Sequence, residues 1–143
     1  MGYFEDLTPY TYYHLGIRNN TLNIGWLDIA YPYKHGKLPD EFLNKLWDFV
    51  QIKLFRLRGF HVCNLCSEKV ISPIIVRKGD VDFKLGDAEI RVLGEDGKIY
   101  AAPNLIYHYI TVHGYRPPDE FVQAVLKGPN PDSEIYRKFL AEF

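Results

Sequence analysis

The sequence predicts an α+β fold, in which helices pack on an antiparallel sheet. Apolar and polar side chains alternate as in strands through the middle of the chain, whereas helical spacing recurs toward both ends. Glu95, Asp96, Gly97 and Lys98 supply a hairpin turn between two such strands. With 143 residues, of which 47% are hydrophobic, the chain can bury a core without disulfides. We therefore expect one globular domain over residues 1–143, with residues 128–143 as a C-terminal helical extension.

The N-terminal third should contain an apolar covering segment, a strand and a helix. The first twenty residues are rich in tyrosine, and we expect them to lie across the core. From Thr21, Leu22, Ile24 and Trp26 alternate with Asn23 and Gly25, which is typical of a half-buried strand. Pro39 then occupies the first position of a predicted helix over residues 39–52, whose acidic first turn complements the helix dipole.

Strand patterns follow at residues 55–58, 71–76, 88–93 and 99–100, and together they predict an antiparallel meander. Glu89 and Arg91 share one face of the third strand, because side chains alternate with period two. We expect that face to meet solvent, so that Glu89→Gln changes stability little. The alternative makes Glu89 a general base beside a metal-bound water.

Three helices are expected near residues 104–113, 118–127 and 132–142. Gly114 and Gly128 supply the stops of the first two. The tetrapeptide Pro-Asp-Glu-Phe occurs at residues 39–42 and again at 118–121. Two independent uses of favourable N-terminal helix chemistry explain this repeat better than duplication, because the flanking sequences share little.

A candidate metal site follows from the positions of the cysteines and histidines. Cys63 and Cys66 are the only cysteines, and a Cys-x2-Cys turn can direct two thiolates at one tetrahedral ion. His108 and His113, near the end of a predicted helix, supply two further donors with the spacing that zinc tolerates. His61, two residues before the first cysteine, competes with them. The expected cofactor is zinc.

Two alternatives remain for these residues. Positions 108 and 113 lie roughly 140° apart on an ideal helix, so both histidines meet one ion only if the last turn tightens or opens. Otherwise His113 is a core histidine beside Tyr109 and Ile110. The cysteines are alternatively a redox dithiol, although Ser67 to Val76 is β-branched and contains Pro73, unlike the helix that follows thioredoxin-type cysteines.

Charge and motif content exclude several classes of function. Seventeen basic against eighteen acidic residues give a formal charge of −1, which offers no strong signal for nucleic acid. No apolar run is long enough for a membrane span, and the start lacks a secretory signal, so we expect a cytoplasmic protein. Serine-hydrolase and nucleotide-binding motifs are absent. The basic residues Lys53, Arg56 and Arg58 are expected to form a solvated face.

Five stretches of the sequence carry a recognisable pattern, at residues 3–7, 22–27, 59–66, 89–92 and 102–118. They include Gly-Phe-His-x-Cys-x2-Cys and Ala-Pro-x-Leu-Ile-x-His-Tyr-x3-His-Gly-Tyr-Arg-Pro-Pro. In these stretches the chain resembles an uncharacterised bacterial family of unknown function. The resemblance runs from the N-terminus to about Val125. It implies a soluble single-domain unit with a recurrent His/Cys pattern, and it implies no reaction.

Two functions from different classes follow. The favoured one is a zinc-stabilised module that binds a protein partner through an aromatic surface, for which the eleven tyrosines are suited. The alternative is a small zinc-dependent hydrolase or deaminase-like enzyme, with Cys63, Cys66 and one histidine on the metal and water in the fourth position. Four protein ligands indicate the first, and three ligands plus water in a cleft indicate the second.

Overall fold

The computed structural model describes residues 2–11, 20–66 and 71–142, and over these ranges it confirms the α+β fold class. The strands are β1 (Thr21–Asn23), β2 (Ile74–Lys78), β3 (Val81–Leu85), β4 (Glu89–Leu93) and β5 (Ile99–Pro103). The helices are α1 (Asp40–Val50), α2 (Ile106–His113), α3 (Asp119–Lys127) and α4 (Glu134–Ala141). No helix within the described ranges is long and apolar enough to cross a membrane.

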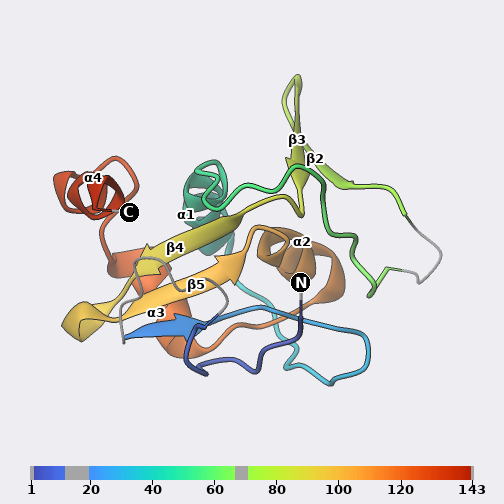
Figure 1. The fold of residues 1–143 in the computed structure, drawn as a ribbon, viewed down its shortest axis with the longest axis horizontal. Coiled ribbons are helices and arrows are strands. Elements are labelled where there is room, and N and C mark those ends of the chain that lie inside the picture. The colour runs from blue at the N-terminus through green and yellow to red at the C-terminus, as the bar shows by residue number, and fades with distance from the viewer. Residues whose placement is uncertain (1, 12–19, 67–70, 143) are drawn as a thin grey trace.

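The central sheet has the strand order β1-β5-β4 (Figure 1). As predicted, β4 and β5 form an antiparallel hairpin. In contrast, β1 runs parallel to β5, so the sheet is mixed rather than a simple meander. A parallel pair needs a long connection, and here the whole chain between β1 and β5 supplies it. The strands β2 and β3 form a separate antiparallel hairpin that projects from the body (Figure 1).

Residues 55–58 do not form the strand that their alternation predicted. Leu54 exchanges two backbone hydrogen bonds with Glu89, and the Leu57 N–H donates to the carbonyl of Asp87. Between these contacts, Phe55 has a φ of 48°, which is outside the extended region. The chain therefore follows the edge of β4 for a few residues without continuing a regular ladder.

The helices α1 and α3 cover one face of the sheet. Phe42 and Phe121, the phenylalanines of the two Pro-Asp-Glu-Phe segments, are fully buried, and their rings pack edge to face at 6.4 Å. Both segments begin helices as expected, but Pro39 and Pro118 are N-caps, so each helix begins one residue later than predicted. The helices pack on the apolar face that carries Ile90 and Val92.

The N-terminal segment covers the opposite face, so the prediction that this face meets solvent is wrong. Tyr10 is buried in a small cluster with Trp26 and Ala101. Glu89 and Arg91 are 6% and 3% exposed beneath this cover. The Arg91 guanidinium lies 4.6 Å from the centre of the Tyr10 ring. Alternation along β4 correctly placed the two charges on one face, but a segment distant in sequence decides what covers that face. Residues 12–19 of the expected cover lie outside the described part of the chain.

The C-terminal helix α4 packs on the same body. Tyr136 is 1% exposed, its ring meets Phe49 of α1 at 5.5 Å, and its hydroxyl donates to the Arg91 carbonyl at 2.5 Å. Ser133 caps the helix by accepting from the Tyr136 N–H. The residues after position 128 therefore contribute a helix to the core, as the sequence predicted.

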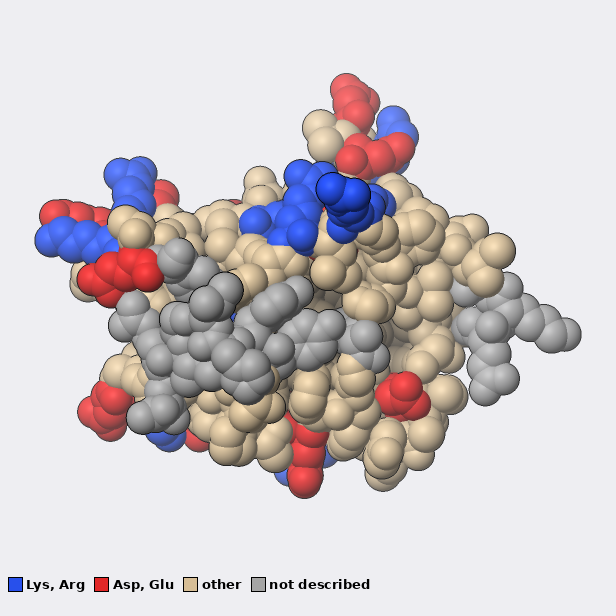
Figure 2. Space-filling view, viewed as in Figure 1, with Lys and Arg blue, Asp and Glu red and all other residues tan. Residues whose placement is uncertain are grey.

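Basic side chains gather over the base of the β2–β3 hairpin (Figure 2). Lys53, Arg56 and Lys84 surround the buried Asp87, with nitrogen-to-oxygen distances of 2.7, 3.6 and 4.0 Å. The expected solvated face is therefore correct for the exposed Arg56 and Arg58 but wrong for Lys53, whose side chain is only 15% exposed. Lys53 turns inward because a buried carboxylate requires a partner of opposite charge.

Candidate metal centre

The two cysteines lie in a turn that is anchored to another loop. The Cys66 N–H donates to the Cys63 carbonyl at 3.4 Å, which closes the turn. Between them, Asn64 accepts from the Ile29 N–H at 3.1 Å and donates to the Asp28 carboxylate at 3.0 Å. These bonds fix the orientation of the turn relative to residues 28–31. The sequence did not predict that Asn64 and Asp28 anchor the turn, because nothing near Asp28 indicates which distant segment it contacts.

The two histidines come together because the last turn of α2 opens. Gly114 has a φ of 68°, and its N–H donates to the carbonyl of Tyr109, five residues back. A five-residue bond is the wide π-type closure, with more residues per turn than an α-helix. The 108–113 pair, which a regular helix would separate, thereby lies on one side with ring centroids 5.0 Å apart. The five-residue spacing of the two histidines predicted that the last helical turn must tighten or open for both to bind one ion, and the structure shows an open turn.

Two sulfur and two nitrogen donors converge at this point. The ligand atoms of Cys63, Cys66, His108 and His113 all lie within 4.8 Å of one another. His113 Nε2 lies 3.4 Å from Cys63 Sγ and 3.3 Å from Cys66 Sγ, and His108 Nε2 lies 3.2 Å from Cys66 Sγ. Tetrahedral zinc with ordinary bond lengths separates sulfur from nitrogen by roughly 3.6 Å. The donor set therefore fits a tetrahedral ion of this kind.

Burial gives the four donors different environments. Cys63 is 1% exposed and His108 is 6% exposed, whereas Cys66 is exposed and His113 is intermediate. Burial raises the pKa of the Cys63 thiol to about 11. Burial, with the neighbouring His113, lowers the pKa of His108 to about 4, and burial also lowers the pKa of His113. Neutral imidazoles are the form that binds a metal, and a bound cation favours the thiolate form of the cysteines.

The structure does not bring His61 into this group. Its N–H donates to the Gly86 carbonyl at 2.7 Å, so the residue is held against the connection between β3 and β4. A Cβ at Gly86 would lie 2.3 Å from the His61 carbonyl oxygen, which shows how closely the two backbones approach. Burial lowers the pKa of the His61 imidazole. Of the five candidate ligands, four converge and His61 lies apart.

Glu89 is also outside the Cys/His group. Its Oε1 accepts from the Tyr10 hydroxyl at 2.8 Å and from Arg91 Nη1 at 2.9 Å. Burial raises the pKa of this carboxyl, although Arg91 and Tyr10 act in the opposite direction. The carboxylate is therefore neither on a solvated surface nor beside the candidate metal. It forms a buried ion pair.

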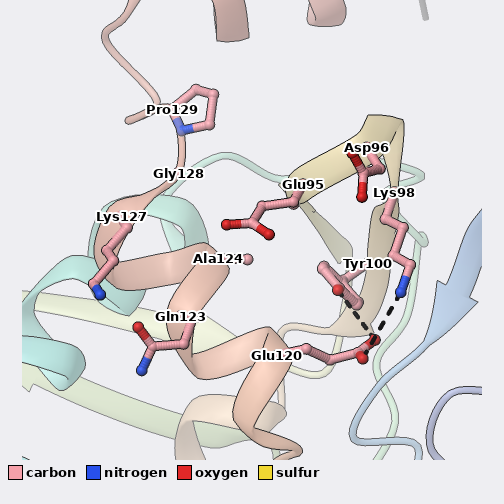
Figure 3. Close-up of a pocket in the computed structure, with 11 residues that line it drawn as sticks. Glu95, Asp96, Lys98, Tyr100, Glu120, Gln123, Ala124, Lys127, Gly128 and Pro129 are labelled. Atoms are coloured by element: carbon pink, nitrogen blue, oxygen red, sulfur yellow. Dashed lines mark hydrogen bonds and ion pairs between the residues drawn. The ribbon is translucent and has the colours of Figure 1, made fainter.

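A separate recess of about 610 Å³ lies between the β4–β5 turn and α3 (Figure 3). Glu120 accepts from the Tyr100 hydroxyl at 3.1 Å and lies 3.9 Å from Lys98 Nζ. Burial and this carboxylate raise the pKa of Tyr100 to about 12. The Glu95 carboxylate points into the same space (Figure 3). None of the four Cys/His residues lines this recess, so it is not the pocket of a metal enzyme built on them.

Together the fold and the cluster define a small α+β protein with a Cys2His2 group that is able to hold a metal ion. The chain belongs to the family described as a domain of unknown function (DUF7919), whose model matches residues 2–126. All four Cys/His residues lie inside the matched part, whereas α4 lies beyond it. No similar protein was found among curated proteins or among solved structures.

Proposed function

We propose that this protein is a zinc-stabilised module that binds a protein partner. The observation that carries the zinc site is the convergence of two thiols and two imidazoles within 4.8 Å. This mixture of sulfur and nitrogen donors in a tetrahedral arrangement is typical of structural zinc. The ion would join the Cys63–Cys66 turn to the end of α2, two segments that are distant in sequence. The thiols must be reduced to bind it, which fits a cytoplasmic location.

Four protein donors support a structural role over a catalytic one. A metal ion with four protein ligands has no free coordination position for the water that a hydrolase or deaminase activates. Such an enzyme also needs a nearby general acid or base, and Glu89, the carboxylate considered for this role, is paired with Arg91. The geometry therefore favours the binding module over the enzyme.

The surface beside the cysteine turn supplies the candidate binding face. Ile29 and Tyr31 are 53% and 49% exposed, and the Tyr31 ring stacks on Tyr3 at 3.9 Å. Tyrosine side chains bring large contact area with little loss of conformational entropy, which suits protein recognition. Because Asn64 bonds to the Ile29 N–H, the metal centre would hold this face in position.

The zinc site is tested by elemental analysis of protein purified without added metal. We expect about one zinc per chain, bound in the wild type and in His61→Ala, and lost in Cys63→Ser and His108→Ala. His61→Ala is the matched control because His61 lies near the turn but outside the cluster. Cys63→Ser should also lower the free energy of unfolding by about 3 kcal/mol or more, since metal binding is part of the folding energy. A folded, reduced and zinc-free wild type would contradict the proposal.

Cobalt substitution separates the structural from the catalytic role. Cobalt in a closed Cys2His2 site should give tetrahedral visible bands that do not change when azide or cyanide is added. Bands that shift with these anions would instead indicate an exchangeable position and would favour the enzyme.

The binding face is tested by a photo-crosslinking amino acid placed at Tyr31 in living cells. A protein adduct is expected there and not at Ile135, a more accessible position at 65% exposure on α4. Absence of an adduct at both positions would count against the protein-binding part of the proposal.

A further inference from the structure

The two cysteines of the candidate metal centre differ sharply in accessibility. Cys66 is exposed, whereas Cys63 is 1% exposed. Their sulfur atoms lie within 4.8 Å, in a turn closed by the Cys66 N–H bond to the Cys63 carbonyl. An oxidant in solution can therefore reach one sulfur first, and the second sulfur stands close enough to react with the product.

We propose that Cys66 and Cys63 form a peroxide-sensitive thiol switch that releases the metal ion when it is oxidised. The inference rests on the proposed zinc site and assigns a mode of regulation to it. Cys66 is the attacking sulfur because it is the accessible one, and Cys63 is the resolving sulfur. Both are metal ligands in the reduced state, so a disulfide between them removes two of the four donors.

The chemistry balances with a peroxide as the two-electron oxidant. The Cys66 thiolate attacks one peroxide oxygen, the O–O bond breaks, and a sulfenic acid and hydroxide form. The Cys63 thiolate then attacks the Cys66 sulfur, the S–S bond forms, and the S–O bond breaks to release a second hydroxide. Two protons convert the hydroxides to water, and the zinc ion leaves with its charge. A dithiol reductant reverses the disulfide by thiol–disulfide exchange.

The anchoring of the turn connects this reaction to the proposed binding face. Asn64, between the two cysteines, bonds to Asp28 and to the Ile29 N–H. Release of the ion frees the cysteine turn from α2, because the cysteines and the histidines no longer bind a common ion. The loop that carries Ile29 and Tyr31 then loses its link to α2 through the metal. Oxidation is therefore expected to weaken partner binding at this face.

The test uses the full-length, zinc-loaded protein and graded hydrogen peroxide. Released zinc is followed with a chromophoric chelator, and the Cys63–Cys66 disulfide is identified by mass spectrometry of the unreduced peptide. We expect zinc release and disulfide formation to rise together, and both to reverse after addition of dithiothreitol and zinc. In hydrogen exchange, the Ile29 amide should exchange faster in the oxidised protein.

Two variants test the order of attack. In Cys63→Ser, the remaining Cys66 should be labelled rapidly by a sulfenic-acid reagent, whereas in Cys66→Ser the buried Cys63 should be labelled slowly. Labelling is compared in the metal-free proteins, so the comparison holds even where a variant binds no zinc.

A third variant tests whether zinc release needs both thiols. Cys66→His keeps four donors without a second thiol, and it should retain zinc at peroxide concentrations that release zinc from the wild type.

The outcomes distinguish this proposal from the one on which it rests. A wild type that never binds zinc would overturn both. Zinc that stays bound while peroxide is consumed, or zinc released with sulfinic acid in place of the disulfide, would overturn the switch alone. Unchanged exchange at Ile29 after zinc release would overturn the connection to the binding face.

Discussion

Glu89 illustrates how one residue acquires a role from segments that are distant in sequence. Its strand alternates regularly, and alternation alone put it in solvent. In the structure its carboxylate lies beneath the N-terminal segment, 2.9 Å from Arg91 and 2.8 Å from the Tyr10 hydroxyl. Removing one charge of a buried pair costs far more than removing an exposed one, because the remaining charge stays desolvated.

The variant Glu89→Gln should therefore lower the free energy of unfolding by about 3 kcal/mol. Glu41→Gln is the matched control, since Glu41 is 72% exposed and lies 3.9 Å from Lys45. That change should cost less than about 0.5 kcal/mol. Urea denaturation measures both. Equal effects would show that the Glu89–Arg91 pair does not behave as a buried one.

The buried carboxyl of Asp87 should contribute to the loss of stability at acid pH. Burial acts to raise its pKa, but hydrogen bonds and the charge of Lys53 outweigh burial, so the pKa lies below its ordinary value. A carboxyl whose pKa is lower in the folded state contributes stability above its unfolded pKa and loses it as the pH falls through the folded value. We expect this loss below about pH 4. Urea denaturation across this range should show a shallower acid decline in Asp87→Asn than in the wild type, and an unchanged decline in the exposed-site control Asp132→Asn.

At the scale of the element, the end of α2 determines whether the two histidines can share an ion. The wide closure depends on Gly114, whose left-handed backbone lets its N–H reach the Tyr109 carbonyl. Thr111, inside the same turn, bonds back to the Tyr107 carbonyl at 2.9 Å, a contact that often bends helices. The geometry of the candidate metal centre is thus set partly by a residue outside the four proposed ligands.

The variant Gly114→Ala should cost about 1–2 kcal/mol of stability, the strain of a side chain in the left-handed region. It should also weaken zinc binding about tenfold, because the turn that positions His113 relaxes. Gly79→Ala is the matched control: Gly79 has a φ of 61° and no atom within 4 Å of an added Cβ. It should show the same strain in thermal unfolding and no change in zinc affinity by competition titration. Equal zinc affinity in both variants would contradict the role of the opened turn.

The sequence predicted the elements whose information is local. Both Pro-Asp-Glu-Phe starts, the β4–β5 hairpin and the terminal helix follow from short-range chemistry and periodicity, and the four donors follow from residue type and spacing. The predictions that were wrong concern contacts between segments that are distant in sequence. The parallel pairing of β1 with β5 and the cover over Glu89 have no local signal. His61 could not be separated from His108 and His113, because its exclusion results from backbone contact with Gly86.

At the scale of the whole molecule, the candidate metal centre and α4 lie at different parts of the same core. The Cys/His group brings the cysteine turn and α2 together, while α4 closes the core over α1 and β4 through Tyr136 and Phe139. α4 also lies outside the matched family region. Because its contacts are made to Phe49 and to the Arg91 carbonyl, we expect α4 to affect global stability without affecting the metal.

The variant Tyr136→Ala tests this separation in the full-length protein. Loss of a buried aromatic ring should lower the free energy of unfolding by about 3–5 kcal/mol, and Tyr136→Phe, which removes only the hydroxyl bond to Arg91, by about 1 kcal/mol. Ile135→Ala, at a 65% exposed position on the same helix, should change it by less than about 0.5 kcal/mol. Zinc content and affinity should equal the wild-type values in all three, provided that each is folded at the temperature of measurement. Weaker zinc binding in folded Tyr136→Phe would show instead that α4 and the metal centre are coupled through the core.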